Sequence, residues 1–147
     1  MKRAIITLII SLFFAGYSYS QTLHIFGGKG QNIYLGCLNC SYLEKESIWN
    51  EQGNYGNNLY SKSIWNSNGI YGSAKSNYSP WNRNAKFPPA LKDDIGEFYG
   101  LLSTNEVNGY RAEFELVRKL YESHALIKND VKGWYYKIFG QSVVENN

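Results

Sequence analysis

The chain opens with an apolar run of thirteen residues at positions 4–16, which follows a short basic N-terminus. The small residues Ser18 and Ser20 stand shortly before residue 21. These features are typical of a secretory signal peptide, whereas a membrane-spanning helix needs roughly 20 apolar residues. We therefore predict that residues 1–20 are a signal peptide, with an uncleaved anchor as the alternative. Residues 21–147 are then an exported protein, periplasmic or secreted, with no further membrane span.

Beyond residue 20, short apolar stretches flank turn residues at two places. Residues 23–26 and 33–35 lie on either side of a glycine-rich segment, and residues 90–91 and 97–102 lie on either side of an Asp-Asp-Ile-Gly segment. Short runs of strand-forming residues bounded by glycine and aspartate are typical of antiparallel hairpins. We therefore predict two hairpins, one before and one after the central part of the chain.

The C-terminal third has apolar positions with helical spacing. Spacings of 4, 3, 4 and 3 residues join Tyr110, Phe114, Val117, Tyr121 and His124. Such spacing places side chains on one face of an α-helix, for which Asn108 is a candidate N-cap. A second, shorter helix is predicted over residues 130–140. Its inward positions are Val131, Trp134, Tyr135 and Ile138.

Between these parts, residues 41–84 repeat with a period of sixteen. Six columns keep this period: Ser47, Ser63 and Ser79; Trp49, Trp65 and Trp81; Asn50, Asn66 and Asn82; Gly53 and Gly69; Tyr55 and Tyr71; Gly56 and Gly72. Six columns in one register identify a true internal repeat. A unit of this length is too short for an autonomous helical repeat, and it suits a strand–turn–strand unit or a turn–strand coil.

Composition bears on whether the repeats fold. They are rich in Tyr, Asn, Gly and Ser, as disordered prion-like segments are, and they contain few aliphatic residues. The strict register favours folding, because burying one Trp or Tyr removes roughly 150–250 Å² of surface from water. We therefore predict a single α+β domain at residues 21–147. In it, a small β-rich aromatic repeat segment packs against a C-terminal hairpin and two helices at residues 90–140.

Cys37 and Cys40 are the only cysteines and form a C-x-x-C motif. In an exported protein, this pair predicts a short-loop disulfide, here at the start of the repeats. Cys40 also occupies the position of the repeat glycines. The first alternative is a redox pair, which the absence of a following βαβ pattern disfavours. The second is a metal site or free thiols, and His24 and His124 have no zinc-like spacing.

Charge is unevenly distributed, although the whole chain has a formal net charge of only +3. Between Glu51 and Asp93 the sequence has five basic residues and no acidic ones. From Asp93 onward, acidic residues outnumber basic ones by nine to six. A mildly basic repeat region is compatible with an anionic polymer, but five charges fall well short of a dedicated nucleic-acid domain.

Sequence signals for catalysis are weak. The chain lacks G-x-S-x-G and H-E-x-x-H motifs, and neither histidine has a convincing carboxylate or nucleophile partner in sequence. The glycines at positions 27–30 lack the spacing of a phosphate-binding loop, and the acidic turn at residues 93–97 lacks the spaced ligands of a calcium loop. We therefore expect no enzyme, no cofactor and no metal. The alternative is a small secreted hydrolase or nuclease that uses His24 or His124.

A rare string, YLGCLNC at residues 34–40, precedes the S-I-W-N and G-x-Y-G units. This order resembles a group of small secreted bacterial proteins of uncharacterised function. The further matches are Phe26-Gly27-Gly28, Ser79-Pro80-Trp81-Asn82, Pro88-Pro89 and Gly96-Glu97-Phe98-Tyr99-Gly100. The resemblance covers residues 23–104, and Ile95 replaces the second acidic residue of the group's D-x-D-G turn. It implies an exported domain and no particular activity.

A periodic display of aromatic, amide and hydroxyl groups has a physical use. Aromatic faces stack on sugar rings or bases, and amides and hydroxyls hydrogen-bond to their edges. The candidate binding residues are Trp49, Trp65, Trp81, Tyr55, Tyr71, Asn50, Asn66 and Asn82. The alternative for the tryptophans is a core role. We expect a non-enzymatic binding or interaction module for a cell-envelope glycan, a polyanion or another polymer; a self-assembling matrix protein is a further alternative.

Overall fold

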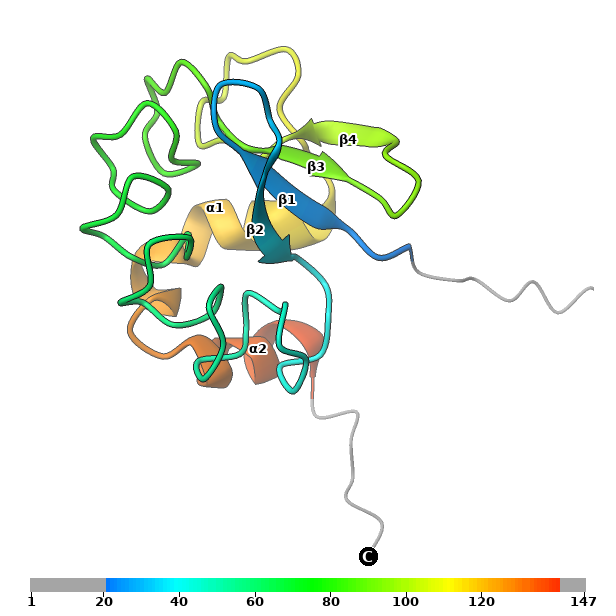
Figure 1. Ribbon diagram of the computed structural model, residues 1–147, viewed down its shortest axis with the longest axis vertical. Coiled ribbons are helices and arrows are strands. Elements are labelled where there is room, and N and C mark those ends of the chain that lie inside the picture. The colour runs from blue at the N-terminus through cyan, green and yellow to red at the C-terminus, as the bar shows by residue number, and fades with distance from the viewer. Residues whose placement is uncertain (1–20, 141–147) are drawn as a thin grey trace, which may run out of the picture.

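The computed structural model describes residues 21–140, so the predicted signal peptide lies outside the described residues. Four strands form one antiparallel sheet in the order β2-β1-β3-β4. They are β1 His24–Gly27, β2 Ile33–Cys37, β3 Ala90–Lys92 and β4 Phe98–Leu101. The two hairpins are those predicted, and β1 and β3 join them at the centre of the sheet (Figure 1). With two helices added, the predicted α+β class is confirmed.

The last residue of each edge strand forms a short pairing with a neighbouring segment. At the β2 edge, Cys37 forms a parallel bridge with Ser47, and at the β4 edge Leu101 forms one with Arg111. Each of the two strand residues donates one backbone hydrogen bond to the added segment and accepts one from it. An open strand edge is a template for pairing with another chain. These bridges therefore reduce what either edge offers to a second molecule.

The two helices are α1 Glu115–Ile127 and α2 Val131–Phe139, and they pack against each other. Asp130 caps α2, because its Oδ1 accepts a hydrogen bond from the Gly133 N at 3.0 Å. A side chain on Gly133 would collide with the Asp130 carboxylate, which accounts for a glycine inside the helix. None of the helices within residues 21–140 is both long and apolar enough to cross a membrane.

The predicted helical stripe begins too early, because α1 starts at Glu115. Tyr110 lies outside the helix and is 73% exposed. Asn108 closes a turn instead of capping the helix, since its Oδ1 accepts a hydrogen bond from the Tyr110 N at 2.9 Å. The following residues pair with the β4 edge, so the sheet holds this segment out of the helix. The buried face of α1 is formed by Val117, Leu120 and Ile127.

The repeats form a coil of consecutive turns rather than the strands expected, and this coil lies beside the sheet and the helices (Figure 1). Most turns are closed by a hydrogen bond from a backbone N–H to the carbonyl three residues earlier, such as Asn66 N to Ser63 O at 3.2 Å. One turn in each unit is longer, as in the bond from Asn57 N to Gly53 O. Four turns of three residues and one of four make up a unit, which accounts for the period of sixteen.

The serine and asparagine columns close these turns. Ser63 Oγ accepts a hydrogen bond from Trp65 N at 3.2 Å. Asn66 Oδ1 accepts one from Asn68 N at 3.0 Å, and its Nδ2 donates to Tyr60 O at 3.1 Å. The same bonds recur at Ser47, Asn50, Ser79 and Asn82. Side chains that bond to their own backbone favour turns over strands, which explains why the repeat contains no ladder.

The repeat tryptophans form the core of the coil, with 0%, 2% and 7% of Trp49, Trp65 and Trp81 exposed. Each indole N–H donates to a backbone carbonyl, which belongs to the segment before the repeats for Trp49 and to the preceding unit for Trp65 and Trp81. The pairs are Trp49 with Leu38, Trp65 with Ile48 and Trp81 with Ile64, at 2.8, 2.6 and 2.6 Å. A buried indole needs such a partner. The tryptophan of each unit therefore fills the core and also bonds its unit to the segment before it.

The predicted disulfide is present where the coil begins. Cys37 is the last residue of β2, and its Cα lies 5.6 Å from that of Cys40. Ser47 Oγ donates a hydrogen bond to the Cys40 carbonyl at 3.2 Å, which ties the same turn to the first repeat. The closed loop is short, so its entropic contribution to stability is only about 2 kcal/mol. The bond serves mainly to hold the first turn against the sheet.

Candidate functional site

The structure places the eight predicted binding residues in different surroundings. The tryptophans lie in the core, which is the alternative that the sequence left open, and the asparagine side chains bond to the backbone. Tyr71 is 9% exposed and packs beside Gly27. Tyr55 is half-buried, with its ring edge-on to Tyr34 at 5.2 Å between centroids. A binding role for these residues stays a prediction. The hollows of the surface lie beside the buried tryptophans.

His24 has the carboxylate partner that the enzyme alternative requires. Its Nε2 lies 2.7 Å from Asp94 Oδ1, and its Nδ1 lies 2.9 Å from the Tyr34 hydroxyl. Burial and, to a lesser extent, the Glu46 charge raise the pKa of Tyr34, so the phenol stays protonated and is a poor nucleophile. Both ring nitrogens of His24 are therefore engaged. The network ties β1, β2 and the turn after β3 together.

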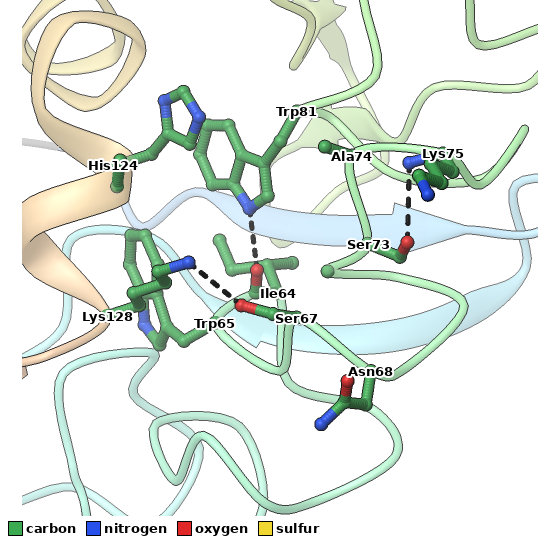
Figure 2. A pocket seen from close by; sticks show the side chains of 12 residues that line it. Ile64, Trp65, Ser67, Asn68, Ser73, Ala74, Lys75, Trp81, His124 and Lys128 are labelled. Carbon is green, nitrogen blue, oxygen red and sulfur yellow. Dashed lines mark hydrogen bonds between the residues drawn. The ribbon is translucent and has the colours of Figure 1, made fainter.

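A series of hollows lies where the coil meets the helices. Four pockets form a row there, which we call the seam. Pocket A has a volume of about 590 Å³, and its lining includes Trp65, Ser67, Trp81, His124 and Lys128 (Figure 2). Pocket B, of about 530 Å³, shares Trp81 and His124 with pocket A. Pockets A and B therefore lie on either side of the Trp81 and His124 rings.

The other two pockets continue the row toward α2. Pocket C has a volume of about 90 Å³ and shares Lys128 with pocket A. Pocket D, of about 450 Å³, shares Glu51 with pocket C and reaches Lys132. Because each pocket shares a lining residue with the next, the seam follows the coil from the first repeat to the third.

His124 stacks on Trp81 at the boundary between pockets A and B. The ring centroids are 4.5 Å apart and the planes differ by 4°. Its Nδ1 lies 3.1 Å from the Tyr121 carbonyl, so in the neutral ring Nδ1–H donates and Nε2 is left as an acceptor. Burial lowers the pKa of His124, and the charge of Lys128 lowers it further. Neutral imidazole at this position can accept a hydrogen bond from a ligand hydroxyl.

Lys128, at the C-terminal end of α1, joins the helix to two successive repeats. Its Nζ donates to Ser67 Oγ at 3.0 Å, and its carbonyl accepts a hydrogen bond from Asn58 Nδ2 at 3.1 Å. Figure 2 shows the ammonium reaching across pocket A toward Ser67. A cation near a helix C-terminus is also favoured by the helix dipole. Lys128 therefore places a positive charge in the middle of the seam.

Pockets A and C are built from equivalent positions of successive repeats. The coil residues of pocket C are Glu51, Gly56, Asn57 and Asn58. Sixteen positions later stand Ser67, Gly72, Ser73 and Ala74, all of which line pocket A. The same part of the repeat unit thus faces the helices in the first and second units, so the period of the sequence recurs in these two pockets.

Successive units of the coil contact successive turns of α1. His124 stacks on Trp81 of the third unit, and Lys128, four residues later, bonds to Ser67 of the second unit. Four residues are about one turn of an α-helix. One helical turn therefore spans one coil unit at this place.

Pocket B differs from the rest in having many charges. Arg83, Arg111 and Arg118 line it together with Glu106, Glu113 and Glu122. Arg111 is held in place, because its guanidinium lies 4.2 Å from the Tyr121 ring centroid and its Nη1 lies 2.8 Å from Glu113 Oε1. Opposite charges in equal number give this end of the seam polar contacts without a strong net field.

Some of the residues that shape the seam were missed by the sequence reasoning. Lys128 belongs to no sequence motif, and Asn58 and Ala74 differ between repeats, so neither belongs to a column. His124 is predicted on the helical stripe and in the hydrolase alternative, and it lies between pockets A and B. The one signal available was the period itself, since equivalent positions of a coil face the same neighbour.

Acid should destabilise the protein through His124. Its pKa is lower in the folded state than its ordinary value of 6.5, so the unfolded state binds more protons at intermediate pH. The stability that this shift provides is complete above that ordinary value and is lost as the pH falls through the folded pKa. We expect His124→Gln to reduce the difference between urea midpoints at about pH 8 and about pH 5. Equal pH dependence in both proteins would contradict this assignment.

Comparison of the chain with protein-family models, curated proteins and solved structures gives no match. The resemblance to small secreted bacterial proteins stays a prediction. The seam is the surface with a bearing on function, because its pockets A and C are lined by equivalent positions of successive repeats.

Proposed function

We propose that this protein is an exported, non-enzymatic module that binds a linear polymer along the seam, and that the polymer is a glycan of the cell envelope. The observation that carries the proposal is the register of pockets A and C: each of the four coil residues of pocket C has its counterpart sixteen positions later in pocket A. A groove with a repeated lining suits a ligand with a repeated unit. A small molecule occupies one pocket, so a repeated lining would not strengthen its binding.

The lining of pocket A supports a polyhydroxyl ligand. Ser67, Asn68 and Ser73 supply hydroxyl and amide groups, and Lys128 supplies an ammonium. Sugar hydroxyls both donate and accept, so such groups match them with few charges. The neutral edge of His124 adds an acceptor beside an apolar ring pair. Ligand sites commonly combine an apolar wall with a few placed polar groups in this way.

The alternatives have less support. A hydrolase based on His24 lacks a free ring nitrogen, since Asp94 and Tyr34 occupy both. His124 has a free Nε2 in its neutral form, but no carboxylate is among its hydrogen-bond partners in the described chain. Assembly through strand edges is disfavoured by the bridges at the ends of β2 and β4. Binding without catalysis needs no reactive group beyond the residues that line the seam.

Tryptophan fluorescence of the mature protein tests the proposal. Soluble envelope glycans should shift the emission saturably and protect it from acrylamide, because Trp81 lines pockets A and B. Lys128→Ala should weaken binding by about tenfold, as expected for a lost charge-assisted hydrogen bond. Lys62→Ala is the matched control, since Lys62 is an exposed repeat lysine outside the four pockets.

Two results would count against the proposal. One is the absence of saturable binding to any neutral or acidic glycan at low and high salt. The other is equal loss of affinity in the Lys128 and Lys62 variants, which would indicate attraction by overall charge. Strong salt dependence with no difference between neutral sugars would redirect the search to polyanions.

A further inference from the structure

Pockets A and C are equivalent by sequence register but differ widely in size, at about 590 Å³ and about 90 Å³. The lining shows one cause. Asn58 stands in pocket C where Ala74 stands in pocket A. The Asn58 side chain crosses the seam and donates to the Lys128 carbonyl at 3.1 Å, whereas Ala74 ends at its Cβ. One side chain thus narrows the seam between the first and second repeats.

The hydrogen bond from Asn58 satisfies a carbonyl at the C-terminal end of α1. The last carbonyls of a helix have no partner within the helix. Asn58 supplies one to Lys128, the C-cap residue of α1. An amide is long enough to reach that carbonyl and polar enough to bond to it, which an alanine is not. The contact therefore closes the seam with a defined hydrogen bond rather than by crowding.

The pockets that stay open on the other side of Asn58 have the lining that a glycan chain needs. Ser67, Asn68 and Ser73 supply hydroxyl and amide groups to pocket A, and the neutral ring of His124 supplies an acceptor at the boundary with pocket B. A polyhydroxyl chain is therefore the occupant that this part of the seam favours.

We propose that Asn58 sets where a glycan chain bound along the seam ends. The inference rests on the proposed function and deepens it. Residues of the chain occupy pockets A and B, on either side of His124 and Trp81. The next residue toward α2 is excluded by the hydrogen bond between Asn58 and Lys128.

The test is a calorimetric titration with cello- and chito-oligosaccharides of increasing length. For the natural protein, the Kd should fall with each added residue until pockets A and B are filled, and then stay level. Asn58→Ala should move this plateau to an oligosaccharide one residue longer, with about a tenfold lower Kd for that length. Ala74→Asn should weaken binding of every length, because it puts the closing side chain into pocket A.

Asn54→Ala is the matched control. Asn54 is an exposed asparagine in the same repeat, and it lines none of the four pockets. Its variant should keep the natural plateau and affinity. Thermal unfolding of all variants shows whether they are folded, and we expect only small shifts, since Asn58 is exposed and its bond lies at a helix end.

The outcomes separate this inference from the proposed function. Binding of oligosaccharides with the same plateau in the natural protein and in Asn58→Ala overturns the inference and leaves the seam as a glycan site. Binding of polymeric polyanions without binding of the oligosaccharides also overturns it. If neither oligosaccharides nor polymeric glycans bind, the proposed function itself is wrong.

Discussion

Replacing Trp65 with alanine should lower the free energy of unfolding by about 4 kcal/mol, close to the whole stability of many small domains. Trp65 is 2% exposed and lies between the rings of Trp49 and Trp81, with centroids 5.8 and 5.6 Å away. Its removal leaves a cavity in the middle of the stack. It also removes the donor to the buried Ile48 carbonyl.

Urea denaturation followed by circular dichroism measures this loss without relying on tryptophan emission. Trp65→Phe keeps most of the ring and removes the N–H, so it should cost about 1–3 kcal/mol, the price of an unsatisfied buried carbonyl and a smaller ring. Trp134, which lies in α2 outside the stack and is only partly buried, is the position for comparison. If Trp65→Ala costs no more than Trp134→Ala, the stack is not the core of the coil.

Replacing Gly72 with alanine should cost about 3 kcal/mol, although it adds a single methyl group. The added Cβ would overlap the Asn66 carbonyl oxygen and lie 2.7 and 2.8 Å from the Asn66 C and N atoms. These are backbone atoms of a turn that hydrogen bonds already hold, so they cannot move aside as a flexible side chain does. The turn must therefore open to admit the methyl group.

Gly109→Ala is the control for this prediction. No atom lies within 4 Å of the position that its Cβ would take, and its φ is not positive. The substitution should be neutral or slightly stabilising, because alanine restricts the unfolded chain. Urea midpoints of the two variants give the comparison. If Gly72→Ala stays within roughly 0.5 kcal/mol of Gly109→Ala, the close approach of the two turns is not rigid.

Much of the fold could be predicted because its signals are local. The hairpins follow from glycine and aspartate between short apolar runs, and the disulfide follows from two cysteines in a chain predicted to be exported. α2 is marked by Asp130 at its start and Gly140 at its end. The beginning of α1 could not be predicted in the same way. Tyr110 has helical spacing, but pairing with the β4 edge, far away in sequence, determines its conformation.

The site was harder to predict because the repeated columns serve folding but resemble a binding surface. The asparagine column recurs because each amide closes a turn, and the tryptophan column recurs because each indole bonds to the segment before its unit. Both columns are explained by folding alone, although they looked like a binding surface. The residues that vary between units, such as Asn58 and Ala74, are the ones that shape the seam. In this chain, regularity identifies the scaffold and departures from it identify the candidate site.

The contact of successive coil units with successive turns of α1 restricts how such a protein can change in length during evolution. Duplication of sixteen residues would add a tryptophan, its acceptor carbonyl and a complete set of turns, so the coil by itself accepts growth. A unit inserted between the second and third would, however, move Trp81 and Ser67 apart, so they could no longer meet His124 and Lys128 together. About four more residues in α1, one turn of helix, would restore both contacts. Longer relatives should therefore gain residues in both places at once, in a ratio of about four coil residues to one helix residue.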